Sequence, residues 1–139
     1  MASYNKFHVT VENLAEGIHD LGADVLTIAL STTANVPVNT NTILANITEI
    51  AYTNLSARVL SITTSAQTTG TYKLVLADLV LTASGAVATF EHTTLFNDTP
   101  TSPVDPLISW WSYGSAVTLA NGETFTFDAD ATNGVMQLV

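Results

Sequence analysis

The sequence contains no cysteine and only three basic side chains, and each shortage excludes a class of function. A chain without cysteine forms neither a disulfide nor a thiolate site. Binding to a nucleic-acid backbone requires clustered Lys and Arg side chains, which three among 139 residues do not supply. The twelve carboxylates bring the net charge to −9, so an anionic membrane surface would repel the chain. We therefore expect neither nucleic acid nor a membrane as a partner.

Long apolar segments are also missing. Thr, Ser or Asp interrupts each of them well before the roughly 20 residues that a membrane-spanning helix needs. The first residues, Met1 to Tyr4, lack the basic segment and the following apolar stretch of a secretory signal peptide. The sequence therefore predicts synthesis in the cytoplasm.

Charge of either sign is scarce. Charged residues make up 11% of the chain, against about 25% in ordinary globular proteins, and the mean hydropathy is +0.33. A soluble monomer usually carries a mixture of charges, whereas the polar residues of this chain are mostly Thr, Ser and Asn. Such a surface favours a subunit that neighbours cover in an assembly. The alternative is an acidic β-domain that its net charge keeps in solution.

One helix-like segment precedes a long β-like region. Apolar residues recur at spacings of three and four at the following positions: Phe7, Val11, Leu14, Ile18 and Leu21. This stripe predicts a helix over about residues 5–17, which Gly17 weakens or ends.

From residue 24 onward the apolar period becomes two, with turns rich in Gly, Asn and Pro. We expect strands over 24–30, 43–50, 57–63, 72–81, 87–96, 107–113 and 135–139, with two further short strands before and after 121–122 and a long loop over 31–42. The pattern predicts an all-β protein: a single domain over residues 1–139, folded as an antiparallel β-sandwich of jelly-roll or Ig-like type with one short N-terminal helix.

Two local features refine this expectation. The apolar phase changes at Asp78, which indicates a β-bulge at Ala77-Asp78 or a strand buried on both faces. Asn121-Gly122 lies between alternating segments and predicts a hairpin turn.

The titratable residues form no recognised catalytic or metal-binding pattern. His8 and His19 would lie roughly 16 Å apart on one helix, and His92 belongs to a distant strand, so they do not share a metal. Residues 128–134 resemble the start of a calcium loop, but Asn133 replaces its glycine and Val139 its bidentate Glu. A turn in which Asp and Asn side chains bind the local backbone is the simpler interpretation. We expect no enzyme, no catalytic residue, no cofactor and no metal.

The aromatic strand is the feature that points to binding. Trp110 and Trp111 are neighbours on a predicted strand, so they face opposite sides of the sheet. The same alternation places Leu107 and Tyr113 on the face of Trp111. An exposed Trp–Tyr pair would suit an interface or a sugar-stacking surface, whereas a helix packed over the sheet would bury it. Five residues are the candidate interface: Tyr4, Phe7, Val11, Trp111 and Tyr113.

Several stretches together resemble a family of small phage and prophage virion structural proteins. They are 7–22 (FHVTVENLAEGIHDLG), 24–30 (DVLTIAL), 70–81 (GTYKLVLADLVL), 95–99 (LFNDT), 106–114 (PLISWWSYG) and 119–135 (LANGETFTFDADATNGV). The resemblance covers nearly the whole chain and supplies no catalytic residue. It implies a structural component encoded with head and tail genes.

From this resemblance we expect a capsid decoration, or cement, protein on the virion surface, a homo-oligomer that binds the major capsid protein. A tail or fibre component that contacts the host through Trp111 and Tyr113 is the alternative. A small glycoside-active or calcium-binding enzyme is a third interpretation, and it requires a cleft with two facing carboxylates.

Overall fold

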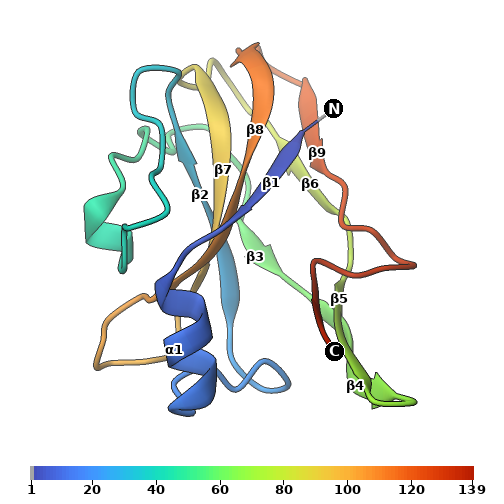
Figure 1. Ribbon diagram of the computed structural model, residues 1–139. Helices are drawn as coiled ribbons and strands as arrows, with labels where there is room; N and C mark the ends of the chain where they lie inside the picture. The colour runs from blue at the N-terminus through green and yellow to red at the C-terminus, as the bar shows by residue number, and fades with distance from the viewer. Residues whose placement is uncertain (1) are drawn as a thin grey trace.

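Two layers of antiparallel strands form the protein, which confirms the all-β sandwich predicted from the sequence. The structure is a computed structural model that describes residues 2–139. One layer is a five-stranded sheet in the order β1 (Ser3–Lys6), β8 (Leu107–Val117), β7 (Phe90–Asn97), β2 (Leu26–Ser31) and β3 (Val59–Leu60). The other layer contains two smaller sheets. They consist of β10 (Met136–Leu138), β5 (Thr71–Leu76) and β4 (Ile62–Thr68), and of β6 (Leu79–Thr82) with β9 (Thr124–Phe127) (Figure 1).

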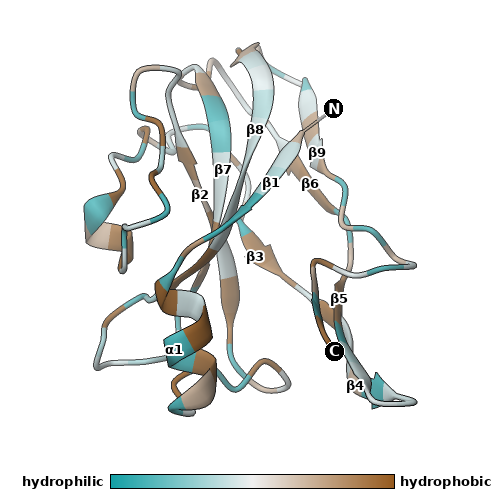
Figure 2. Cartoon of the chain, viewed as in Figure 1, coloured by the Kyte–Doolittle hydropathy of each residue, from teal (hydrophilic) through white to brown (hydrophobic). Residues whose placement is uncertain are grey.

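The main core lies between the layers, and a smaller core lies on the outer face of the five-stranded sheet. Every residue of β2 is buried, because Leu26, Ile28 and Leu30 face the second layer while Ala29 faces outward. Figure 2 shows brown, apolar segments along β2 with paler ones between them. The outer core also contains Phe7, and the long loop after β2 supplies Ile47 to it. The segment between β2 and β3 thus helps to cover the sheet, through a residue that lies beyond the predicted loop over 31–42.

The N-terminal helix differs from its prediction. Helix α1 spans Val9–Ala15, and residues 3–6 instead form β1, which pairs with β8. The buried residues of the helix are Thr10 and Asn13, and the Thr10 hydroxyl donates to the carbonyl oxygen of Ile108 at 2.6 Å. Leu14 of the apolar stripe is only partly buried against the main core, and Val11 is exposed. Within residues 2–139, no helix has the length and apolar character needed to cross a bilayer.

Three other local predictions are corrected. Residues 43–50 form no named strand, and the 3-10 helix η1 (Leu44–Asn46) lies there instead. The apolar phase changes at Asp78 because the chain leaves β5 and enters β6 in another sheet, so it marks neither a bulge nor a strand buried on both faces. Asn121-Gly122 forms a turn, but β8 and β9 on its two sides belong to different sheets, so no hairpin forms there.

Strand β8 also departs from simple alternation. The register between β7 and β8 shifts between Leu95 and Phe96, which indicates an irregularity near the start of β8. As a result Leu107 joins Trp110 in the outer core, while Ile108 and Trp111 face the main core. The prediction that Leu107 shares the face of Trp111 is therefore wrong. Trp110 and Trp111 do face opposite sides, as predicted.

A polar cluster lies beside β2, where the short strand β3 does not pair with it. The Tyr52 hydroxyl accepts a hydrogen bond from the Leu30 amide at 2.9 Å and donates to Glu49. The Arg58 guanidinium lies 3.6 Å from the centre of the Tyr52 ring, approaches Glu49 at 3.8 Å and donates to the carbonyl oxygen of Ile28. These side chains satisfy backbone groups that no neighbouring strand reaches.

Candidate functional site

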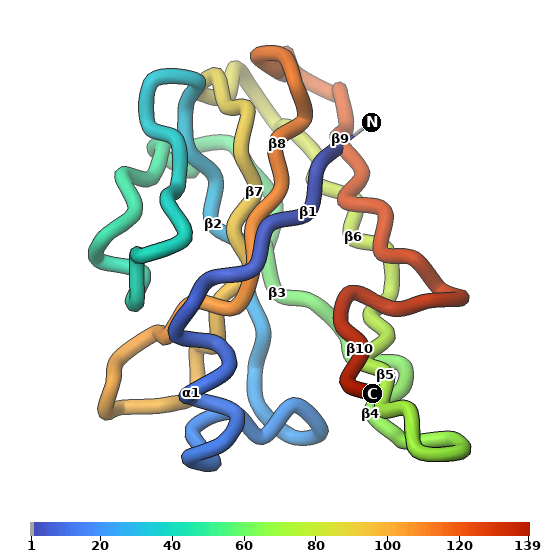
Figure 3. Tube along the Cα trace, viewed as in Figure 1, coloured from blue at the N-terminus to red at the C-terminus, as the bar shows by residue number. Residues whose placement is uncertain are grey.

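A groove lies where the two layers separate. On the opposite side the chain passes directly from β3 into β4 and joins the layers. On this side β1 and β10 are both edge strands, and they do not pair with each other. Figure 3 shows their traces on opposite sides of the opening, with α1 at one end. The groove measures about 610 Å³, and we call it the β1–β10 groove. Its lining consists of Tyr4, Lys6, Thr10, Val11, Leu14, Trp111, Phe127, Asp128, Asp130, Gly134, Val135, Met136, Gln137 and Leu138.

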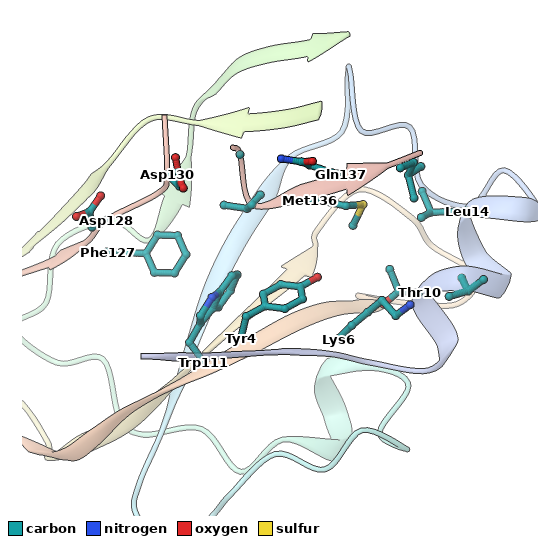
Figure 4. A pocket seen from close by; sticks show the side chains of 14 residues that line it. Tyr4, Lys6, Thr10, Leu14, Trp111, Phe127, Asp128, Asp130, Met136 and Gln137 are labelled. Atoms are coloured by element: carbon teal, nitrogen blue, oxygen red, sulfur yellow. The ribbon is translucent and has the colours of Figure 1, made fainter. Parts of the chain in front are cut away.

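Aromatic rings form one wall and the base of the groove. Trp111 lies between Tyr4 and Phe127, with ring centres 5.5 Å and 5.0 Å apart and edge-to-face geometry. Figure 4 shows Met136 and Gln137 of β10 across the groove from Trp111 and Tyr4. A smaller hollow of about 190 Å³ continues from Trp111 to Tyr113. Edge-to-face packing fixes these rings in place, so their exposed parts form a preorganised apolar surface.

The basic and the acidic groups of the groove lie at different ends. Lys6 lies toward the helix, while Asp128 and Asp130 lie at the end near Phe127 (Figure 4). The Asp130 carboxylate accepts the amides of Thr132 and Asn133, both at 2.8 Å. Hydrogen bonds from Asn133 lower the pKa of Asp130 below its ordinary value. This carboxylate thus belongs to its own turn, in agreement with the simpler interpretation of residues 128–134. Among residues 2–139, no group of three or more His, Asp or Glu side chains lies close enough to bind a metal.

The structure places four of the five candidate interface residues at this opening. Tyr4, Val11 and Trp111 line the β1–β10 groove, and Tyr113, which is 52% exposed, lines its continuation. Phe7 does not belong to the surface, because it is fully buried in the outer core. Trp110 packs on that same core and donates to the Asn39 side chain at 3.2 Å. This arrangement provides an apolar contact surface beside the unpaired edges of β1 and β10.

Sequence reasoning missed the second wall of the groove. Phe127, Met136 and Leu138 come from the last part of the chain, whereas Tyr4 and Val11 come from the first. The sequence predicts the strand over residues 135–139. The alternation of its side chains does not show which other strands lie beside it. No short-range signal connects segments so far apart in sequence.

A second polar site is buried at the base of the five-stranded sheet. Asn97 is fully buried and donates to the Asp24 carboxylate at 2.6 Å and to Nδ1 of His19 at 3.1 Å. Its side-chain oxygen accepts the Thr99 amide at 3.1 Å. Because Nδ1 accepts a hydrogen bond, His19 is neutral in this arrangement. The cluster joins the loop before β2 to the loop after β7.

Burial of His19 predicts a loss of stability in mild acid. Desolvation lowers the pKa of His19 below its ordinary value, although Asp24 opposes the shift. The unfolded chain therefore takes up a proton near pH 6.5 while the folded chain does not, so the stabilising contribution is complete above pH 6.5 and falls below it. We expect a lower urea midpoint at pH 5.5 than at pH 7.5. The difference should shrink in His19→Gln and persist in His8→Gln, a control at an exposed histidine. An equal midpoint at both pH values would contradict this account.

Comparison of the chain with protein-family models, with curated proteins and with solved structures finds no match.

Proposed function

We propose that the protein is a non-catalytic structural component of a phage particle, and specifically a capsid decoration protein that binds the major capsid shell. The observation that carries the proposal is the β1–β10 groove, an open apolar surface in a chain with little charge. Trp and Tyr side chains are the residues most often decisive at protein interfaces, and three of them lie at this opening. The assignment to phage particles is supported by the sequence resemblance.

The groove suits a protein segment more than a compact small molecule. Its rim includes the edge strands β1 and β10, whose unpaired backbone groups accept an added strand. All three residues of β10 line the groove, and two of them, Met136 and Leu138, are apolar. An extended segment of the shell protein that lies in the groove would bury these side chains and stabilise the contact between shell subunits.

The copy number in purified particles tests the proposal. Particles released by a host that carries the gene should contain the protein in a fixed whole-number ratio to the major shell protein, as measured by quantitative mass spectrometry. A low copy number tied to a tail protein would instead support the alternative, a tail or fibre component that uses Tyr113 and Trp111 to stack on sugars. Absence from the particles would overturn both proposals.

A matched pair of substitutions tests the groove itself. Val11 lies in the groove and Val36 in the loop after β2, and they are 54% and 51% exposed. A substitution by Asp therefore replaces an equally exposed valine at each position. We expect Val11→Asp to weaken association with shells at least tenfold, because it places a carboxylate in the apolar contact. Val36→Asp should bind as the unaltered protein does. Co-sedimentation with shells that lack the protein measures both, and equal binding of the two variants would show that the groove is not the contact.

A further inference from the structure

We propose that strand β4 is a self-association edge through which two copies pair antiparallel about a two-fold axis. Among the edge strands, β4 is the longest at seven residues, whereas β1, β3, β6, β9 and β10 have four or fewer. Its sequence, ITTSAQT, contains no charged residue and no proline, and most of it is exposed. Natural edge strands normally carry charge, proline, a cover or a short length that prevents pairing with another chain. The one such device in β4 is the register shift between Ile62 and Thr64, which leaves Thr64–Thr68 regular.

The distribution of charge favours a second copy as the occupant. None of the twelve carboxylates lies within residues 50–77, whereas two of the three basic residues, Arg58 and Lys73, do. The strands β4 and β5 therefore contain no carboxylate. When β4 of one copy pairs with β4 of another, no carboxylate in these strands repels the second acidic chain. Figure 2 shows pale to teal colours on β4, so the contact would be made by backbone and small polar side chains.

The hairpin register identifies the backbone groups that are free to pair. Thr69 and Gly70 both have positive φ, +50° and +85°, and connect Thr68 to Thr71 as a two-residue turn. In such a turn the flanking residues exchange hydrogen bonds, and alternate pairs along the hairpin repeat this pattern. Thr68, Ala66 and Thr64 therefore bond to β5. The backbone N–H and C=O groups of Gln67 and Ser65 point to the free edge.

These free groups define one symmetric register. Ser65 of one copy lies opposite Gln67 of the partner subunit, and Ala66 lies on the two-fold axis. The two Ser–Gln pairs then exchange four backbone hydrogen bonds, and Thr64 lies opposite the partner's Thr68 on the outer face. The small Ala66 side chains permit close approach at the axis. Two three-stranded sheets join into one continuous sheet, and the interface is closed at two copies.

Sedimentation of the full chain over a range of concentrations tests the association. We expect a monomer–dimer equilibrium that strengthens with added salt, because salt screens the repulsion between two chains of net charge −9. Gln67→Pro removes an outward N–H and keeps the backbone hydrogen bonds of the hairpin, so it should weaken dimerisation at least tenfold. It also removes the bond from the Gly70 amide to the Gln67 side chain, a loss that the control Gln67→Thr shares. Gln67→Thr keeps the N–H and should dimerise normally. A thermal melt of each variant verifies that it is folded.

Cross-linking tests the register, since the chain has no other cysteine. Ala66→Cys places two sulfurs across the axis in a non-hydrogen-bonded pair, whose Cα atoms lie about 4.5 Å apart, within disulfide range. We expect rapid formation of a covalent dimer on oxidation, and slow formation for Val80→Cys, a control at an exposed position on β6. A chain that is monomeric at all concentrations, a trimer, or a dimer that Gln67→Pro leaves unchanged would overturn the proposal.

Discussion

Gly134→Ala should destabilise the protein by about 3 kcal/mol, among the largest losses expected for so small a change. Gly134 has φ +76°, and a Cβ atom there would lie 2.4 Å from the backbone oxygen of Leu74 in β5. A side chain in left-handed backbone costs roughly 1–2 kcal/mol, and the collision with a backbone atom adds to it. The obstacle cannot rotate away, because the Leu74 oxygen also accepts the Val135 amide at 2.9 Å.

Gly17→Ala is the matched control. Gly17 has a similar φ of +74°, but a Cβ atom there meets nothing within 4 Å. We expect a loss of about 1 kcal/mol, from the backbone conformation alone. Urea unfolding of both variants measures the difference. If they lose the same stability, the contact with Leu74 does not govern the position of the loop between β9 and β10.

The Gly134 variant also connects stability to the proposed function. The loop holds β10 against β5, and β10 supplies Met136 and Leu138 to the β1–β10 groove. A shift of this loop by the added methyl group would displace one wall of the groove. We therefore expect Gly134→Ala to weaken association with shells even below its unfolding temperature, whereas Gly17→Ala should not.

The sequence predicted the parts of the fold that depend on local pattern. Alternation at Leu26–Leu30 is a property of neighbouring residues, so the pattern predicted this strand correctly. The helix was predicted too long because its stripe assumed that Phe7 and Val11 share one buried face. In the structure Phe7 enters the outer core, and β1 pairs with β8 just before it, so the helix starts later. Tertiary pairing outweighed local periodicity there.

The candidate site depends on pairings that local pattern does not contain. The aromatic strand was recognisable, since Trp110-Trp111 is conspicuous in any strand. Its groove exists because β1 and β10 are both edges, a consequence of strand order in three sheets. The error at Leu107 has the same origin, because a register shift between β7 and β8 is set by the fit of the two strands. Which residues face a cavity therefore follows from the assembled sheets.

The buried cluster around Asn97 should respond strongly to substitution. Asn97→Leu removes the donor to the Asp24 carboxylate and to His19, and leaves the half-buried Asp24 and the buried His19 without that partner. Hydrogen bonds to charged groups contribute about 1.5–3 kcal/mol each, so we expect a loss of about 3 kcal/mol in the free energy of unfolding. Asn5→Ala is the control, since the Asn5 side chain makes only an exposed bond to the Ser3 carbonyl oxygen. It should cost less than about 0.5 kcal/mol.

Asn97→Asp should reverse the pH dependence of stability. This variant distinguishes the contact of residue 97 with Asp24 and His19 from the packing of its side chain, which Asp preserves. The new carboxyl has the shape of the amide but places a second negative charge beside Asp24, so its pKa should rise, and the pKa of His19 should rise with it. Groups whose pKa is raised on folding stabilise the folded chain at low pH and lose that contribution as pH increases. We expect Asn97→Asp to be most destabilised at pH 7.5 and to recover stability toward pH 5.5. The unaltered protein should change in the opposite direction, because burial lowers the pKa of its His19. Urea midpoints at the two pH values measure both slopes, and parallel slopes would exclude direct contact between position 97 and these two titratable groups.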